Sequence, residues 1–350
     1  MTSRRHSARA VQAGFGLAEI MVGLAIGMVT TLVITQAMSN FEGQKRTTTG
    51  SADAQVNGNI ALYTVRRQIQ MASFGLPVFS SRHQPLDCSL ATQFDHDGDP
   101  GTPEIGIDPI AITEGPTPGA SDTIAVTNGD SQMGGSPIGI TNVAGNVVSV
   151  TNNLGCQVND VALVSNGSVC SMSRVTALGA TTQVTLQSAA GADKDSNLAC
   201  MGQWTRTAYS IANNTLMETG VSGVAVPSVA GIVNIQAQYG VSNAADDNRI
   251  AMWIDAGGAV ANAIDFRKRI KAVRVAIVAR NGLLEKDNVT APCSSLTTPA
   301  PTGLCAWAGT VANPAPAIDL SNDPDWRRYR YRVFETTVPL RNVIWSRKVL

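Results

Sequence analysis

The stretch "GFGLAEIMVGLAIGMV", residues 14–29, sets the architecture expected of the whole chain. It opens a run over residues 15–38 in which Glu19 is the only charged side chain. As a helix this run is about 36 Å long, enough to cross the hydrocarbon core of a membrane. By the positive-inside rule the basic head before the run stays cytoplasmic and the rest of the chain lies outside. The head contains three arginines: Arg4, Arg5 and Arg9.

Three interpretations of the run compete. A secretory signal is shorter and ends in a small-residue cleavage site, which "VITQAMSN" does not offer. A plain membrane anchor leaves Glu19 unexplained, because an unpaired carboxylate in lipid costs several kcal/mol. In the third, the chain is cut after Gly14 and Phe15 becomes a positively charged N-terminus. The Glu19 carboxylate of one subunit could then pair with the terminal amine of its neighbour, which would fix the register of packed helices.

Two glycines in the same run, Gly23 and Gly27, form a G-x-x-x-G pattern. This pattern permits close approach of packed helices, although two ordinary membrane-helix glycines would look the same. No proline occurs before Pro77, so a proline kink is not expected.

A second helical pattern follows over residues 60–75. Apolar residues recur there at alternating steps of three and four, which places them on one stripe of a helix: Leu62, Val65, Ile69 and Ala72. Gly75 and Pro77 are stop signals. We expect one long helix over residues 15–75, loosened near residues 43–58; two separate helices are the alternative.

The remainder, residues 76–350, predicts antiparallel β structure. Short runs of alternating Val and Ile, separated by Asn-Gly or Gly, recur between residues 122 and 188. A hairpin is expected about Asn213 and Asn214, and the strongest later strands are residues 232–242 and 269–282. In the last of these, we expect Lys271, Arg274 and Arg280 to line one solvated face.

An even number of cysteines predicts three disulfides in a chain that leaves the cytosol. Fifteen pairings are possible, and buried thiols are the alternative. Neighbour spacing favours Cys293 with Cys305, Cys156 with Cys170, and Cys88 with Cys200. A zinc site is disfavoured because no CxxC pair occurs.

The bulk composition excludes several classes of function. The formal net charge is zero over 350 residues, whereas a nucleic-acid binder normally carries a basic stripe. Common enzyme signatures are missing from the sequence, including G-x-S-x-G, H-E-x-x-H and the P-loop. We therefore expect no catalysis and no cofactor, with calcium as the one candidate ion.

The calcium hypothesis rests on "DHDGDPGTPE", residues 95–104. Asp95, Asp97 and Asp99 alternate as in the first part of a calcium-binding loop. An EF-hand, however, requires Gly at the sixth position and Glu at the twelfth, where this chain has Pro100 and Gly106. A solvated acidic turn is the preferred interpretation.

Gly14, Phe15 and Glu19 together resemble the class III leader of type IV prepilins, although Gly16 and Ala18 depart from its common pattern. The resemblance implies cleavage between Gly14 and Phe15 by a membrane prepilin peptidase, with N-methylation of Phe15. The tail "RVFETTVPLRN", residues 332–342, preceded by the strand at 269–282, resembles the PilW group of minor pilins.

The resemblance implies an α+β, pilin-like fold, in which a long N-terminal α-helix packs on a predominantly antiparallel β-sheet domain with a large β-rich insertion. Residues 1–14 would be the leader, 15–75 the helix (15–38 in the membrane or filament core) and 76–350 a periplasmic or extracellular domain. The expected partners are other minor pilins, the major pilin, the prepilin peptidase and the inner-membrane assembly platform.

The function implied is that of a minor pilin, which helps to initiate a type IV pilus and is incorporated at or near its tip. The protein would first reside in the bacterial inner membrane and then in the pilus. A pseudopilin of type II secretion, or a pilus-tip adhesin or calcium-dependent binding module, is the alternative. The sequence does not distinguish twitching motility, adhesion, DNA uptake and secretion.

Overall fold

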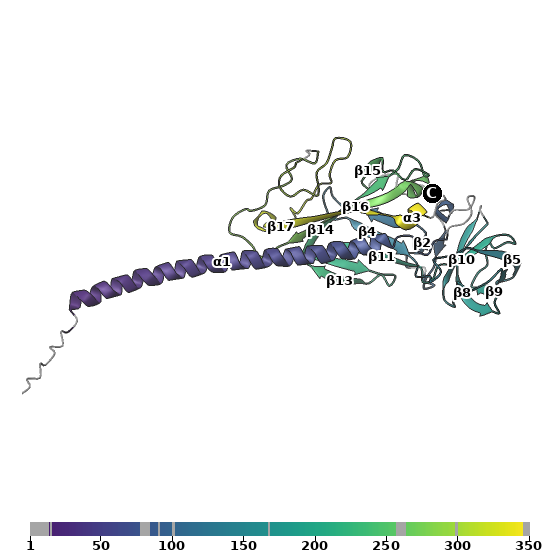
Figure 1. Ribbon diagram of the computed structural model, residues 1–350, viewed down its shortest axis with the longest axis horizontal. Helices are drawn as coiled ribbons and strands as arrows, with labels where there is room; N and C mark the ends of the chain where they lie inside the picture. Colours follow the sequence, from purple (N-terminus) through teal and green to yellow (C-terminus); the bar gives the residue numbers. More distant parts are fainter. Residues whose placement is uncertain are drawn as a thin grey trace, which may run out of the picture. The chain divides into compact units, whose positions relative to one another are not determined.

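The structure of the protein is a computed structural model (Figure 1). It describes residues 14, 16–77, 85–89, 92–99, 102–166, 169–256, 264–297 and 300–345, without the side chains of residues 46, 47 and 345. Phe15 and most of the expected leader lie outside the described residues. The chain divides into two units, Met1–Gly50 and Ser51–Leu350.

Helix α1, Leu17–Gln70, is 54 residues long. The expectation that it loosens near residues 43–58, or divides into two helices, is wrong, because the helix is unbroken there. No proline interrupts it, so no backbone donor is lost. Glycines in its middle cost only about 1 kcal/mol each relative to alanine, which is too little to break a long helix. These glycines are Gly43, Gly50 and Gly58.

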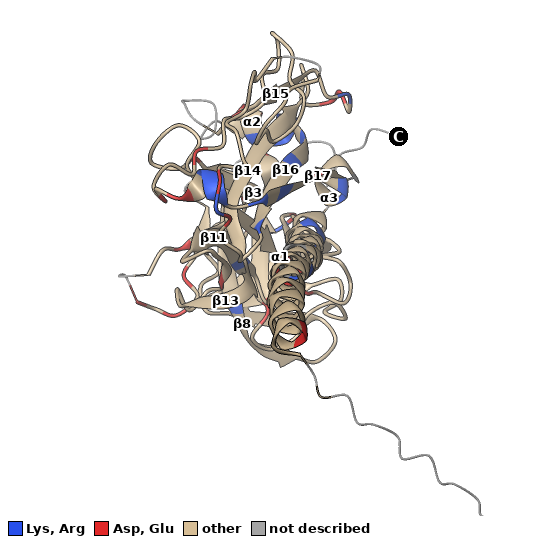
Figure 2. Ribbon diagram, turned by 90° about the vertical axis from the view of Figure 1, so that its left-hand side faces the viewer, with Lys and Arg blue, Asp and Glu red and all other residues tan. Residues whose placement is uncertain are grey.

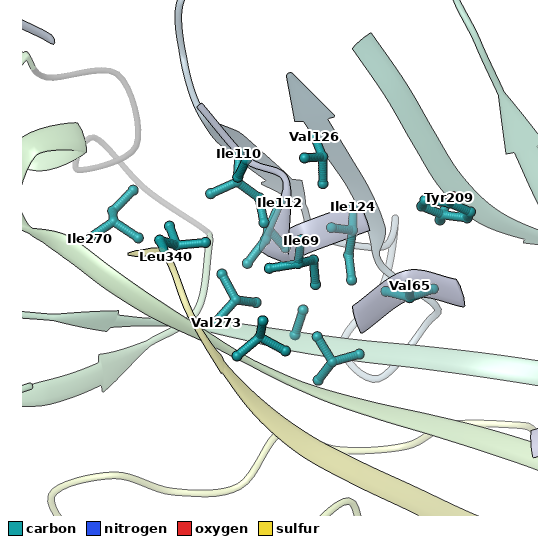
Figure 3. Packing of buried hydrophobic residues seen from close by; sticks show 14 of the residues in the cluster. Val65, Ile69, Ile110, Ile112, Ile124, Val126, Tyr209, Ile270, Val273 and Leu340 are labelled. Carbon is teal, nitrogen blue, oxygen red and sulfur yellow. The ribbon is translucent and has the colours of Figure 1, made fainter. Parts of the chain in front are cut away.

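Within the unit Ser51–Leu350, the last part of α1 packs its apolar stripe into the main core (Figure 3). Val65 and Ile69 are fully buried, and Ile69 lies beside Ile112 and Ile124 of the neighbouring strands. Leu62 is partly buried against the same core. The stripe predicted from the spacing of apolar residues is confirmed, and burying it stabilises this end of the helix.

A four-stranded antiparallel sheet, in the order β15-β14-β16-β17, contributes to the same core. Ile277 lies opposite Ile235 on one side and Phe334 on the other. The two long central strands are the ones that the sequence predicts most strongly. The strands are β14 (Ile232–Val241), β15 (Met252–Ile254), β16 (Ile270–Arg280) and β17 (Tyr331–Pro339).

A second sheet has five antiparallel strands in the order β13-β12-β11-β4-β3. Its predicted hairpin is confirmed: Asn213 and Asn214 join β11 to β12 with φ angles of 50° and 56°. Asparagine tolerates this left-handed region better than most residues. The strands are β3 (Ile110–Thr113), β4 (Thr123–Asn128), β11 (Thr205–Ala212), β12 (Thr215–Thr219) and β13 (Ala225–Ala230).

The remaining long strands form a closed barrel in the order β10-β5-β6-β9-β8-β7. Its interior is filled by side chains such as Val148, Val184 and Leu198, so it is a packed core and not a channel. The strands are β5 (Ile138–Ala144), β6 (Val147–Val150), β7 (Val161–Ser165), β8 (Cys170–Gly179), β9 (Gln183–Leu186) and β10 (Asn197–Cys200).

Short elements complete the described chain. They are η1 (Pro85–Asp87), β1 (Gln93–Phe94), β2 (Ile105–Gly106), α2 (Ile264–Arg269), η2 (Trp326–Arg328) and α3 (Arg341–Trp345). The predicted α+β class, a long N-terminal helix with predominantly antiparallel sheets, is confirmed.

All six cysteines are paired, but two of the three expected pairings are wrong. Cys293–Cys305 is confirmed, whereas the other disulfides are Cys88–Cys170 and Cys156–Cys200. Neighbour spacing fails because β10 pairs directly with β7 in the barrel, which brings the end of β10 close to the segment before β7. Topology, and not separation along the chain, decides which sulfurs meet.

The expectation of a solvated basic face on β16 is also wrong. Figure 2 shows basic residues on β16 and on α2. The segment between β16 and β17 packs on β16, because its Ala306 and Trp307 form one buried cluster with Ala276. Lys271 is only 1% exposed. The Arg274 guanidinium lies between the rings of Trp253 and Trp307, 4.8 and 4.2 Å from their centroids. Arg280 forms an ion pair with a loop aspartate. Aromatic rings and carbonyls therefore replace water around these cations.

Candidate functional site

The apolar N-terminal part of α1 is the first candidate site. It contains a stretch that is long and apolar enough to cross a membrane, judged by length and composition alone. Its large side chains are exposed in the isolated chain; Leu24, Ile26 and Val29 are each more than 60% exposed. So much exposed apolar surface requires a cover of lipid or of other protein.

The threonines of this stretch bond to the helix itself. The hydroxyls of Thr30 and Thr31 donate to the carbonyls of Ile26 and Gly27, each at 2.7 Å. Thr35 donates to the carbonyl of Thr31 at 2.6 Å. Because these hydroxyls are satisfied without water, they add little to the cost of placing the helix in an apolar environment.

Glu19 lies in the first turn of α1. The amide of Gly16, the residue before the helix, donates to Glu19 Oε2 at 3.4 Å. A carboxylate three residues past the N-cap that accepts from the N-cap amide is one half of a capping box, and the positive end of the helix dipole favours its charge. The bond is long, so the carboxylate keeps most of its capacity for a stronger partner. Phe15 lies outside the described residues, and its pairing with Glu19 stays a prediction.

Gly23 and Gly27 lie on the exposed surface of this helix. A Cβ added to either residue would meet nothing within 4 Å. Within one chain nothing therefore requires glycine at these positions, and their role in helix packing between subunits also stays a prediction.

The acidic loop predicted as a calcium site forms a turn in which Asp95 and Asp97 accept hydrogen bonds from their own loop. Asp95 Oδ1 accepts from the amides of Asp97 (3.2 Å) and Gly98 (2.6 Å). Asp97 Oδ1 accepts from the amide of Asp99 (3.0 Å) and the hydroxyl of Thr102 (2.8 Å). These bonds, the one from the Asp99 amide foremost, hold the pKa of Asp97 below its ordinary value. Within the described ranges, no three His, Cys, Asp or Glu side chains are arranged to hold a metal ion.

Two of the hollows in the described surface could not be found by sequence reasoning. One, of about 520 Å³, lies beside the acidic loop and is lined by His96, Glu104 and Arg174, among others. The other, of about 350 Å³, brings together Ser51 and Arg332, among others. The residues of each hollow come from segments far apart in the chain, so no local pattern could have identified them.

Comparison with known proteins gives one family. Residues 197–342 match the family model of PilW, the type IV pilus-assembly protein W. A comparison with curated proteins finds no match. Among solved structures, a type IV-like pilin from Thermus thermophilus aligns over 83% of this chain and 96% of its own, at 9% identity and a TM-score of 0.33, which is too low to carry an argument. The resemblance to PilW predicted from the tail and the strand before it is therefore confirmed over residues 197–342, which hold β14, β16, β17 and the tail motif. The leader lies outside the matched residues.

Proposed function

We propose that this chain is a minor pilin that helps to initiate a type IV pilus and is incorporated at or near the pilus tip. The observation that carries the proposal is Glu19, a carboxylate in the first turn of an otherwise apolar helix, in a chain whose C-terminal part matches a pilus-assembly family. A buried charge is tolerated only where a group of opposite charge pairs with it, and the terminal amine of a processed neighbouring subunit is such a group.

The proposed route begins in the inner membrane. The prepilin peptidase cleaves between Gly14 and Phe15, and Phe15 becomes N-methylated. The basic head stays cytoplasmic, and the unit Ser51–Leu350 faces the periplasm. Its three disulfides suit that oxidising compartment. Other minor pilins, the major pilin and the assembly platform are the proposed partners, and the action is assembly without catalysis.

Three measurements test this proposal in the producing bacterium. Mass spectrometry of the mature chain should find a methylated Phe15 at its N-terminus. Immunogold labelling of sheared filaments should place the chain at filament ends, and deletion of its gene should reduce the number of surface pili. A chain that begins at Met1, or labelling absent from filaments, would refute the proposal. Normal pili combined with a loss of protein secretion would favour the pseudopilin alternative.

A second candidate function, adhesion, is favoured by the position of the barrel. Strands β5 to β9 precede the residues that match PilW. The barrel is inserted between two paired strands, because Asn128 at the end of β4 lies opposite Thr205 at the start of β11. A module inserted in this way adds surface without disturbing the sheet that carries it.

The insertion can be tested by deletion, which also removes Val161, Leu163 and Met201 from the main core. Replacing residues 130–203 by an Asn-Gly turn, together with Cys88→Ser because Cys88 loses its disulfide partner, should leave the β4–β11 pairing in place. Loss of adhesion with pili intact would support the adhesin. Unchanged adhesion would refute it.

A further inference from the structure

The cavity of about 350 Å³ lies where three distant parts of the unit Ser51–Leu350 meet. Ser51 comes from α1, Asn281 follows β16, and Arg330 and Arg332 stand at the start of β17. The described residues that line this cavity include two arginines and no carboxylate. Its walls therefore carry positive charge.

The two arginines differ in what they contact. Arg330 Nε donates to Glu285 Oε1 at 2.8 Å, so its charge is largely compensated. Arg332 is exposed, and among the described residues its Nε and Nη2 reach only the hydroxyl of Ser51, at 3.4 and 3.2 Å. A neutral hydroxyl at these distances is a weak acceptor for a guanidinium, which binds carboxylates with two parallel bonds. Arg332 thus presents an uncompensated charge at the cavity.

Asn281 supplies a second unsatisfied donor. The residue is only 1% exposed. Its Oδ1 accepts from the amide of Leu283 at 2.9 Å, which fixes the orientation of the side-chain amide. Its Nδ2 has no hydrogen-bond partner among the described residues. A buried donor without an acceptor is costly, so an acceptor from water or from a partner is expected to satisfy it.

We propose that this cavity receives the carboxylate of an aspartate or glutamate from a neighbouring pilus subunit, an inference that rests on the proposed function. A carboxylate has two acceptor oxygens: one meets the exposed Arg332 guanidinium, and the other reaches the covered Asn281 amide after the side chains above it shift. One guanidinium and one amide hold a free anion weakly. A carboxylate held at the cavity by a packed neighbouring subunit acts at a high effective concentration, so it binds in preference to free anions from solution.

Photo-crosslinking of the full-length chain in the producing bacterium tests this proposal. Benzoylphenylalanine replaces Val289, which lines the cavity and is 37% exposed, and crosslinks are mapped in sheared filaments. We expect a crosslink to a pilus subunit at a peptide that contains Asp or Glu. Arg332→Gln should lower its yield about tenfold, as expected for loss of one charged hydrogen-bonding partner.

Two further variants sharpen the test. Arg327→Gln makes the same change of charge on η2, outside the cavity, and should leave the crosslink unchanged. Asn281→Asp keeps the acceptor for Leu283 and supplies the cavity with a carboxylate of its own, so it should lower the yield like Arg332→Gln. A crosslink insensitive to Arg332→Gln, or absent although the chain is present in filaments, overturns the cavity proposal alone. Absence of the chain from filaments overturns the proposed function and this inference together.

Discussion

Gly129 and Met201 meet at the base of the barrel, so closely that a Cβ on Gly129 would lie 2.0 Å from the carbonyl oxygen of Met201. Gly129 follows β4, where the chain leaves the five-stranded sheet, and Met201 follows β10, where it returns. The Gly129 amide also donates to the carbonyl of Phe74, just after α1, at 2.7 Å. This contact fastens the two ends of the inserted barrel to the end of the long helix.

We predict that Gly129→Ala destabilises the unit that contains the barrel by about 1–3 kcal/mol, because the added methyl group would have to displace backbone. The measurement is chemical unfolding of the purified chain in detergent. Gly220→Ala is the matched control: its Cβ meets nothing within 4 Å, and the change should stay within about 0.5 kcal/mol. Equal effects of the two variants would contradict the prediction.

For Glu19, we predict that Glu19→Ala leaves membrane insertion intact but removes the chain from filaments. Insertion depends on the apolar run, which the substitution makes more apolar, whereas assembly needs the carboxylate. Membrane fractions and sheared filaments are compared by immunoblot. Glu42→Ala removes an exposed carboxylate from the same helix, beyond the apolar run, and should behave as wild type. If the Glu19→Ala chain is found in filaments in the same amount as the wild type, this would argue against pairing with a terminal amine.

The disulfides should differ in their contribution to stability. Cys156–Cys200 has a sequence separation of 44 and lies in the barrel core, whereas Cys293–Cys305 has a separation of 12. Loop entropy alone gives about 4 kcal/mol for the first and about 3 kcal/mol for the second. Replacing each pair by alanines should therefore lower the free energy of unfolding more for the barrel pair, and burial adds to the difference. The reverse order would contradict this account.

Local patterns in the sequence predict the helix stripe at Val65 and Ile69 and the turn at Asn213–Asn214, because helix period and turn chemistry act over a few residues. They do not predict that the barrel closes. Closure depends on Asn197 of β10, which pairs with Gly139 on one side and Ser165 on the other. Such pairings join residues far apart in the chain. The disulfide assignment was wrong for the same reason, because separation along the chain does not show which cysteines meet.

The candidate sites follow the same division. Glu19 could be identified because a single carboxylate within an apolar run is visible in the local sequence. The donors at Asn281 and Arg332 look like ordinary strand-end residues until β16 and β17 pair, with Arg280 opposite Tyr331. Arg274 was misread because the segment that brings Trp307 over it has no periodic pattern of its own. Lys271 was misread because its ammonium donates to the carbonyls of Ala245 and Lys268, which no local pattern indicates.

Calcium should not stabilise the protein. In the described structure Asp95 and Asp97 already accept hydrogen bonds from their own loop, which an arriving cation would have to displace. Thermal unfolding with excess EDTA and with 1 mM calcium should give the same midpoint. Binding with a Kd one hundredfold below the calcium concentration would instead add about 2.7 kcal/mol. A rise that Asp97→Ala abolishes would restore the calcium hypothesis.

The last prediction concerns Asp122, which is buried where β4 meets β14. Its Oδ2 accepts from the amide of Ala237 at 2.8 Å and its Oδ1 from that of Gly115 at 3.4 Å. Burial nevertheless raises the pKa of this carboxyl to about 7, and the negative charges of Glu114 and Asp255 add to the effect. At pH values between about 4 and 7, Asp122 therefore holds a proton in the folded chain that it has lost in the unfolded chain, where its pKa is about 3.9.

The sign of the pH dependence follows. Between pH 4 and 7 the folded state binds more protons at Asp122, so the stabilisation from this group is complete below pH 4 and is lost as the pH rises through 7. The free energy of unfolding of the wild type should therefore fall between pH 5 and pH 8 by more than that of Asp122→Asn. The variant loses one acceptor and is less stable throughout, so the slopes must be compared and not the values. Parallel slopes would show that Asp122 is ionised in the folded state at pH 5, and that its two amide donors outweigh its burial.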